Sequence, residues 1–385
     1  MSIPNENLQK LTAFLDSFLF LGVPGYDCAV YYRGEPVYRR MNGYADRENK
    51  IAFTGHEHYN IYSATKVFTC VCAMQLWEQG AFKLTDPLWA YLPEFKEMTV
   101  RTPDGIKKAE KAITVADLFQ MTSGITYCFA SPHIEEAKKV TGGRCPTRET
   151  VKYIAREPLA FEPGEHWLYG FSHDVLAALI EVLSGERFSV YAKKHLFDPL
   201  GMNETTLIAE DEPDYVIPQY LYHNDTCMVE RIHKRITHKL GSEYESGGAG
   251  GISTVDDYLR LLEALRVGDT VLKKSTIDLM QTDRLNETMH KDFWHGDYGY
   301  GLGLRCPRKG YAPTDFGWAG AVGIFLAVDR EHEISVFHGQ HVLNPPNNGT
   351  KHLIMHILNG QSTDQADRLI HEAENKAGLG TLEAR

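Results

Sequence analysis

Four consecutive residues, Ser63-Ala64-Thr65-Lys66, place a hydroxyl and an amine at the start of a long apolar helical pattern. Residues three apart lie on the same face of a helix, so we expect Ser63 and Lys66 to be neighbours. A serine hydroxyl becomes a useful nucleophile when an adjacent base takes its proton, and a lysine is such a base where burial or nearby charge lowers its pKa. The helix N-terminus adds backbone N–H groups that stabilise an oxyanion. The pattern therefore predicts acyl transfer at Ser63, with a plain helix cap as the alternative role of that serine.

Signatures of two other hydrolytic chemistries are missing from the sequence. Neither Gly-x-Ser-x-Gly, the nucleophile turn of α/β-hydrolases, nor His-Glu-x-x-His, the zincin motif, occurs. Two histidine pairs have helical spacing, His338 with His341 and His352 with His356, but neither has an acidic partner at metal-ligand spacing. We therefore expect no metal ion and no cofactor.

The composition is that of a soluble globular protein whose partner is a small molecule. The 385 residues include 51 acidic and 40 basic side chains, a formal charge of −11, whereas a nucleic-acid partner requires clustered positive charge. No apolar run reaches the roughly 18 residues that a membrane-spanning helix needs. The apolar stretch 11–23 lacks the basic start and the cleavage site of a signal peptide, and the seven cysteines are scattered. These features predict a cytoplasmic location and reduced thiols.

The expected elements change in type along the chain. Helices are expected at 6–21, 65–79, 116–121, 147–156, 173–183, 188–197, 255–267 and 350–358, with a helical tail from 362 onward. Strands are expected at 27–33 and 36–41, which form a hairpin, and at 300–306, 323–329 and 334–338. The segment 205–245 is irregular, polar and rich in histidine.

Strands near both chain ends with helices between them predict two domains. Residues 1–62 and 240–385 are expected to form one discontinuous α/β sheet domain, and residues 63–239 a mainly helical domain. The active site is expected at the interface between the two domains.

Several further segments resemble, in the same order along the chain, motifs of the serine β-lactamase-like superfamily, which includes class C β-lactamases, family VIII carboxylesterases and penicillin-binding-protein-like peptidases. The segments are 84–95, 113–125, 161–169, 196–202, 248–257 and 298–303, and the resemblance covers most of residues 25–340. It implies an α+β fold, an antiparallel β-sheet flanked by helices plus an inserted all-helical domain. It also implies that Ser63 and Lys66 are catalytic.

The second motif of that superfamily, Tyr-x-Asn, resembles Tyr169-Gly170-Phe171 in this chain. The resemblance implies that Tyr169 is catalytic and shares proton transfer with Lys66. Phe171 replaces the asparagine whose amide helps to seat the acyl-amide side chain of β-lactams in the family. A phenylalanine cannot form that hydrogen bond, so the replacement argues against a β-lactam substrate.

The third motif, often Lys-Thr-Gly, resembles Trp318-Ala319-Gly320, which is followed by Ala321. The resemblance implies a strand beside the nucleophile, with the backbone N–H groups of Ser63 and Ala321 as the oxyanion hole. The missing lysine removes the charge that recognises the carboxylate of penicillins and peptides. Phe171 and Trp318, together with Ala319 and Gly320, are therefore expected to bind a neutral, rather hydrophobic acyl or alcohol group.

These residues predict a serine hydrolase that forms an acyl-enzyme at Ser63, most consistent with a carboxylesterase for small or hydrophobic esters. A β-lactamase or a D-amino-acid peptidase is the alternative within enzymes. A non-catalytic protein that binds an acylated ligand is a second alternative, against which the retained serine, lysine and tyrosine argue. The oligomeric state is not predicted.

Overall fold

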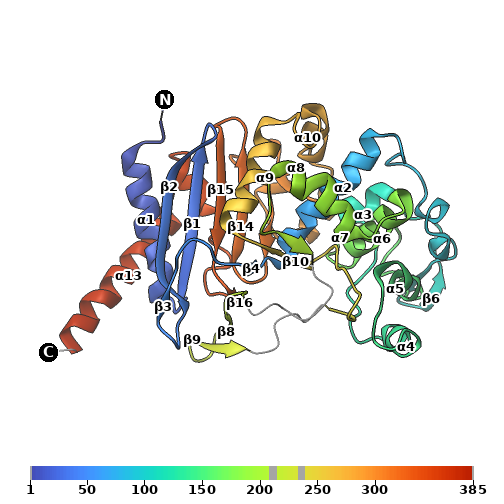
Figure 1. Cartoon of the computed structure of the whole chain (residues 1–385), viewed down its shortest axis with the longest axis horizontal. Coiled ribbons are helices and arrows are strands. Elements are labelled where there is room, and N and C mark those ends of the chain that lie inside the picture. The colour runs from blue at the N-terminus through green and yellow to red at the C-terminus, as the bar shows by residue number, and fades with distance from the viewer. Residues whose placement is uncertain (1, 208–214, 233–238, 384–385) are drawn as a thin grey trace.

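The central sheet is built from both ends of the chain (Figure 1). The computed structural model describes residues 2–207, 215–232 and 239–383. Six antiparallel strands follow the order β13-β14-β15-β1-β2-β3, and Cys28 of β1 lies opposite His338 of β15. The strands are β1 (Gly25–Tyr32), β2 (Glu35–Asp46), β3 (Ile51–Ala52), β13 (Ala319–Gly320), β14 (Ile324–Asp329) and β15 (Ile334–Gly339).

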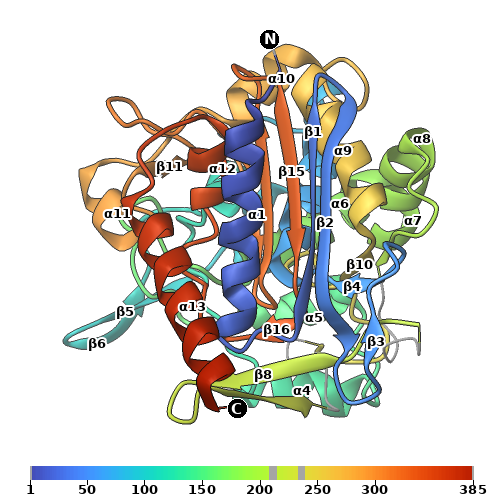
Figure 2. The same ribbon diagram turned by 90° about the vertical axis from the view of Figure 1, so that its left-hand side faces the viewer.

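Helices cover both faces of this sheet. Figure 2 shows α1 (Asn5–Phe20), α12 (Leu353–Leu358) and α13 (Asp364–Glu383) in front of it, while α9 (Val255–Val267) packs on the other face against β14 and β15. The helix α1 buries a stripe spaced for one helical face, Leu11, Phe14, Leu15 and Phe18. Because both faces are covered, every residue of β14 and β15 is buried.

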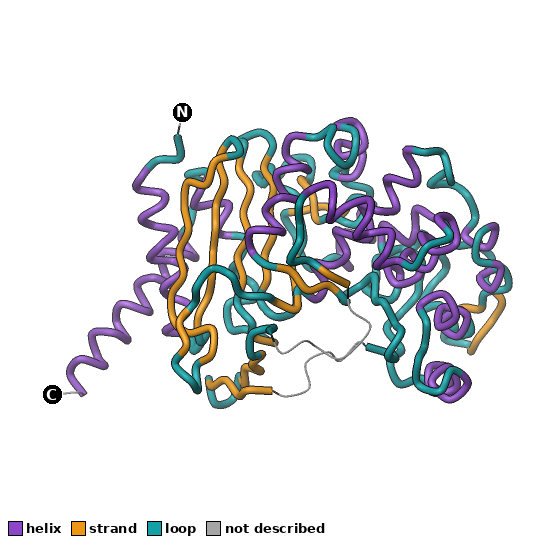
Figure 3. The backbone as a smooth tube through the Cα atoms, in the orientation of Figure 1, coloured by secondary structure: helices purple, strands orange, loops and turns teal. Residues whose placement is uncertain are grey.

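Most of the remaining helices gather beside the sheet, as the purple segments of Figure 3 show. They are α2 (Thr65–Glu78), α3 (Val115–Gln120), α4 (Pro132–Val140), α5 (Thr147–Ile154), α6 (Ser172–Ser184), α7 (Phe188–Ala192), α8 (Asp198–Leu200), α10 (Lys274–Met280) and α11 (Glu287–Asp292). All residues from Thr65 to Met74 of α2 are buried, and the helix packs against α6. A helix that is covered all round lies at the centre of its domain. We propose on this basis the division into 1–62 with 240–385 and 63–239.

The prediction of a single strand at 300–306 is wrong. The chain instead forms a hairpin of β11 (Tyr298–Tyr300) and β12 (Arg305–Pro307), in which Gly299 lies opposite Cys306. Each of these strands has only three residues, which is too short to show a period of two on its own. Glycine and apolar residues alternate from the first strand into the connecting turn, and this pattern resembles one continuous strand. The hairpin places Arg305 in the interior, where it is 1% exposed.

The expectation of irregular structure for 205–245 is also wrong for the part of the segment that the structure describes. It contains β7 (Thr206–Leu207), β8 (Gln219–His223) and β9 (Met228–Ile232), and β8 pairs in parallel with β16 (Val342–Leu343). Residues 208–214 and 233–238 of the segment lie outside the described residues.

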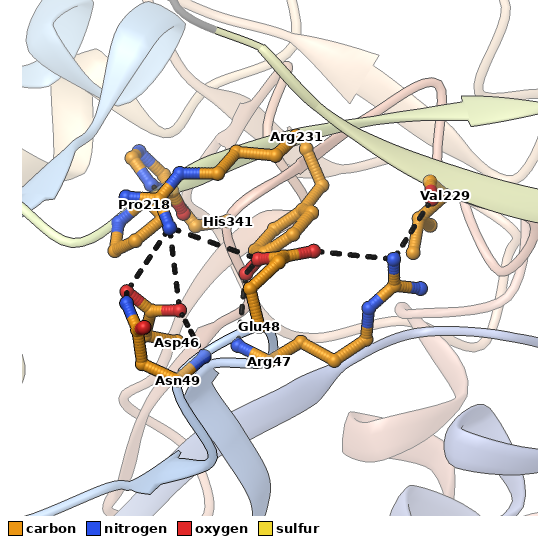
Figure 4. A network of polar contacts seen from close by, with 9 residues as sticks. Asp46, Arg47, Glu48, Asn49, Pro218, Val229, Arg231 and His341 are labelled. Carbon is orange, nitrogen blue, oxygen red and sulfur yellow. Dashed lines mark hydrogen bonds and ion pairs between the residues drawn. The ribbon is translucent and has the colours of Figure 1, made fainter.

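The β8–β9 hairpin is attached to the turn after β2 by a network of polar contacts (Figure 4). Arg231 forms ion pairs with Asp46 at 3.1 Å and with Glu48 at 3.7 Å. Glu48 also accepts a 2.6 Å hydrogen bond from the Tyr220 hydroxyl. These partners are more than 170 positions apart, so no local sequence pattern indicates them.

Two further expectations concern the C-terminal region and membrane association. The helical tail is confirmed as α13, whereas α12 begins at Leu353 rather than at 350, because residues 349–352 form turns. Within the described ranges, no helix is long and apolar enough to cross a bilayer.

Candidate active site

Ser63 lies in a short 3₁₀ helix, Tyr62–Ala64, that leads directly into α2. The preceding residue, Tyr62, has a φ of +47°, which is rare for an aromatic residue and costs of the order of 1 kcal/mol or more. Its hydroxyl donates a 2.9 Å hydrogen bond to the side chain of Gln219 in β8. Burial and this bond hold the strained backbone in place, and with it the position of the Ser63 side chain.

The Lys66 ammonium is surrounded by acceptors. Its Nζ lies 2.8 Å from the carbonyl oxygen of Gly248, 3.2 Å from the Tyr127 hydroxyl and 3.4 Å from Ser63 Oγ. These three acceptors match the three protons of an ammonium group. Nζ also lies 4.4 Å from the centroid of the Tyr169 ring, a favourable cation–π position. The structure thus brings together Ser63, Lys66 and Tyr169.

Lys66 is held as a cation. Burial alone lowers the pKa of its amine, but Tyr127, Tyr169 and the Asp174 carboxylate raise it, and the net direction is upward. The sequence-based condition for a lysine base, a lowered pKa, is therefore not met. A cation at this position attracts negative charge that develops on the oxygen atoms around it.

Asp174, on α6, is a buried carboxylate near Lys66 that the sequence analysis did not identify. Its Oδ1 accepts hydrogen bonds from Ser246 at 2.6 Å and from Tyr244 at 2.9 Å. Burial raises the pKa of Asp174 more than its contacts with Ser246, Lys66 and Tyr244 lower it, so the net direction is upward. A side chain on Gly248 would meet Asp174 Oδ2 at 2.6 Å, so glycine suits the close passage of this backbone between Lys66 and Asp174.

Tyr127 is a second residue that sequence reasoning missed. Its ring stacks on Phe129 with a centroid distance of 4.9 Å and meets the edge of Phe171, also at 4.9 Å. Burial raises the pKa of Tyr127, although Lys66 lowers it, so its hydroxyl stays protonated at neutral pH. The only sequence signal for this residue is that it follows the segment 113–125 by two positions.

Phe171 occupies a different place from the one expected. It is 1% exposed and packs on Tyr127 and Phe129, and it does not line the cavity that opens at Ser63. The expectation that Phe171 contacts substrate is corrected accordingly. Its ring supports Tyr127 because the segment 169–171 crosses the segment 125–127 at close range.

Trp318 orients Tyr169. Its indole Nε1 donates a 3.1 Å hydrogen bond to the Tyr169 hydroxyl, and the two ring centroids are 5.8 Å apart. The half-exposed Trp294 adds an edge contact to Tyr169 with a centroid distance of 5.3 Å. The Trp318 indole therefore holds the phenolic oxygen, and both indoles line the cavity that contains Ser63.

The strand β13 lies directly beside the nucleophile segment. A side chain on Gly320 would meet the carbonyl oxygen of Ile61 at 2.3 Å, so glycine is required for this approach. The strand places Ala319, Gly320 and the exposed Ala321 on the wall of the same cavity as Ser63. Ser63 and Ala321 therefore both line this cavity.

The cavity has a volume of about 650 Å³. Its wall includes Ser63, Tyr169, Trp318 and Ala321, together with polar residues that carry no motif: His295, Arg305, Asn348, Lys351 and His352. Among the described residues no group of three or more His, Cys, Asp or Glu side chains is arranged to hold a metal ion.

Comparisons with known proteins agree with the fold. Residues 11–348 match the family described as Beta-lactamase. Esterase EstB from Burkholderia gladioli is 27% identical over 330 residues, which cover 79% of this chain and 82% of the esterase. Monacolin J acid methylbutanoyltransferase from Aspergillus terreus is 26% identical over 279 residues, which cover 68% of this chain and 66% of the transferase. The solved structure of EstCE1, a hydrolase with promiscuous acyltransferase activity, has a TM-score of 0.74 and 22% identity, covering 97% of this chain and 99% of its own.

Proposed function

The chain belongs to the beta-lactamase family and is an enzyme of the serine hydrolase class, and from this premise we propose that it is a carboxylesterase that forms an acyl-enzyme at Ser63. The observation that carries the proposal is the contact between Lys66 Nζ and Ser63 Oγ at 3.4 Å, with Ser63 in the wall of a cavity of about 650 Å³. A nucleophile with an adjacent charged partner in a concave site is the arrangement expected of acyl transfer.

In the first step Ser63 Oγ attacks the ester carbonyl carbon. The hydroxyl proton passes to the oxygen of Tyr169, which enters this step as a phenolate whose negative charge the Lys66 ammonium balances and which becomes a neutral phenol on accepting the proton. The carbonyl π electrons move onto the carbonyl oxygen. The N–H groups of Ser63 and Ala321 would stabilise this oxyanion, at about 3–4 kcal/mol per donor.

In the second step the tetrahedral intermediate collapses. The C–O bond to the alcohol breaks, the proton held by Tyr169 passes to the leaving oxygen, and the acyl group stays on Ser63. Water then repeats the sequence with the same proton acceptor, which releases the carboxylic acid and restores the Ser63 hydroxyl. No atom is left unbalanced and no cofactor is needed.

An acceptor alcohol could take the place of water, which gives a second candidate function. The support is the similarity to a methylbutanoyltransferase over 279 residues. Product analysis in the presence of increasing methanol distinguishes the two functions. A hydrolase forms mainly the acid at low alcohol concentration, whereas a transferase forms mainly the methyl ester.

We propose an ester substrate, and not a β-lactam or a D-amino-acid peptide, because two side chains that bind those substrates in the family are replaced in this chain. The third-motif lysine position is Trp318, and Phe171 stands where an asparagine amide would be. Faster turnover of nitrocefin than of p-nitrophenyl esters would favour the β-lactamase alternative. Absence of fluorophosphonate labelling together with absence of any turnover would favour a non-catalytic binding protein.

Substitution of the nucleophile tests the proposal. We expect Ser63→Ala to lose turnover of p-nitrophenyl butyrate by about 10,000-fold or more while the circular dichroism spectrum is unchanged. The matched control is Ser275→Ala, an exposed serine on α10, which should keep full activity. Unchanged turnover in Ser63→Ala would remove this serine from the mechanism.

A further inference from the structure

Asp174 is a buried carboxylate that the proposed mechanism does not use. It lies in the first turn of α6 and is 1% exposed, and Lys66 on α2 has no exposed surface. The backbone of Gly248 connects the two side chains, because Lys66 Nζ donates a 2.8 Å hydrogen bond to its carbonyl oxygen and its N–H donates to the Asp174 carboxylate. A side chain on Gly248 would lie 2.6 Å from Asp174 Oδ2 and 3.4 Å from Lys66 Nζ.

The contacts of Asp174 favour its anionic form. Ser246 and Tyr244 donate hydrogen bonds to Oδ1 at 2.6 Å and 2.9 Å, in addition to the N–H of Gly248. A carboxylate that accepts several hydrogen bonds is stabilised as the anion. Lys66 is also one of the groups that lower the pKa of Asp174, and Asp174 is one of those that raise the pKa of Lys66. Each charge therefore supports the ionised form of the other.

The other charged groups near α6 have partners of their own. The helix packs against α2, α3, α5 and α7. Apart from Lys66 and Asp174, the charged side chains of these five helices form hydrogen bonds or ion pairs elsewhere: Glu78 on α2, Asp117 on α3, Glu181 on α6, and Arg148, Glu149 and Lys152 on α5.

The remaining titratable groups around the two charges are mostly neutral. Burial and the charge of Lys66 lower the pKa of His173 to about 3. Burial raises the pKa of the nearby thiols and phenols, so that they stay protonated at pH 7: Cys70, Cys72, Tyr127, Tyr191 and Tyr244. Tyr169, whose ring lies under Lys66 Nζ, is the proton acceptor of the proposed mechanism.

Two buried opposite charges stabilise each other, and removal of one leaves the other uncompensated. We propose that Asp174 is the counter-ion of Lys66 and holds its ammonium group beside Ser63 and Tyr169 through the Gly248 backbone. The inference rests on the proposed function and makes Asp174 a positioning residue, since it contacts none of the reacting atoms. The charge of Lys66 is then balanced before a substrate binds and in either protonation state of Tyr169.

The pH profile of Asp174→Asn tests the proposal. Asparagine keeps the size and the hydrogen-bonding capacity of the side chain, because the hydroxyls of Ser246 and Tyr244 can donate or accept, but it removes the negative charge. The Lys66–Tyr169 pair then loses its protons more readily. Both limbs of the kcat/KM profile for p-nitrophenyl hexanoate should therefore move to lower pH by about 1 unit, the low end of the range for a nearby charge.

Asp117→Asn is the matched control for this profile. Asp117 is a half-buried carboxylate on α3 that accepts hydrogen bonds from Thr114 and Thr122. This variant should leave both limbs at their wild-type pH. A loss of activity in Asp174→Asn with both limbs unmoved would make Asp174 a purely structural residue and overturn the proposal.

Thermal unfolding provides a second test that needs no turnover. Lys66→Met and Asp174→Asn each leave one buried charge without its partner, whereas the double variant removes both. The loss of Tm in the double variant should therefore be smaller than the sum of the two single losses, and additive losses would reject the ion pair. If Asp174→Asn does not fold alone, a folded double variant supports the pair and an unfolded one rejects it. If the wild type does not hydrolyse the ester, the proposed function fails, and this cycle still decides whether Asp174 is the counter-ion.

Discussion

Lys66 and Lys351 are both buried and both belong to the functional cavity, yet their surroundings differ in kind. Lys66 has three oxygen acceptors, a ring face and a nearby carboxylate, and the net direction of its pKa is upward. Lys351 has one amide oxygen, and burial lowers its pKa to about 7. The role of a buried lysine is thus set by its partners. The partners of Lys66 keep its amine protonated, whereas burial without a carboxylate partner among the described residues lowers the pKa of Lys351 to about 7.

The largest effect is expected from substitutions of the proposed proton-transfer pair, Lys66 and Tyr169. Lys66→Met and Tyr169→Phe should each lower kcat for p-nitrophenyl hexanoate by about 100- to 10,000-fold, the usual range for a positioned proton-transfer group. Because the two groups act as a unit, the double variant should be little worse than either single one. A multiplicative loss in the double variant would mean that the two residues act independently.

A pH series sharpens the comparison with an effect of intermediate size. The ammonium form of Lys351 dominates below its pKa of about 7 and is lost above it. Between pH 7 and the ordinary lysine pKa of 10.5, the unfolded chain therefore binds a proton at Lys351 that the folded chain does not. In urea unfolding, the free energy of unfolding of the wild type should rise relative to that of Lys351→Met by about 1.4 kcal/mol per pH unit above pH 7. The charged and titratable groups around Lys351 are His295, Asp297, Arg305, His338 and His352.

The same series in Lys351→Arg provides the control, because arginine keeps its charge across this range. The difference in unfolding free energy between Lys351→Arg and Lys351→Met should be independent of pH. A slope that persists in Lys351→Arg would place the titration on another group of the cavity.

The smallest expected effect concerns the orientation of Tyr169. Trp318→Phe removes the 3.1 Å hydrogen bond to the Tyr169 hydroxyl but keeps an aromatic ring in the wall. Loss of one neutral hydrogen bond corresponds to about 1 kcal/mol, so kcat for p-nitrophenyl hexanoate should fall about 3- to 10-fold. An unchanged kcat would show that this hydrogen bond does not contribute to the orientation of Tyr169.

The proposed catalytic residues could be predicted from the sequence because they have a characteristic local spacing and lie beside family-like motifs. Ser63 and Lys66 are three positions apart across the junction of the 3₁₀ helix and α2, and the segments around Tyr169 and Trp318 resemble family motifs in the right order. Tyr127 and Asp174 were not found because each reaches Lys66 through tertiary packing. The sheet was likewise accessible from buried strands such as β14 and β15.

The basic residues that line the cavity could not be predicted from the sequence in the same way. Lys351 lies in turns that replace the first turn of the expected helix, and it is buried by tertiary packing that no local pattern indicates. Arg305 enters the interior because the expected strand 300–306 is a hairpin. The expectation of a neutral substrate was drawn from Trp318 and Phe171. Phe171 lies outside the cavity wall, and the basic residues Arg305 and Lys351, which do line it, were not identified from the sequence.

The central claim is that Ser63 carries the acyl group during turnover. Acid quenching during turnover of p-nitrophenyl hexanoate, followed by peptide mass spectrometry, tests it most directly. The account predicts one hexanoyl group on the peptide that contains Ser63, and none on that peptide in Ser63→Ala. Turnover without an acylated Ser63, or acylation of another residue at a rate that matches turnover, would contradict the account.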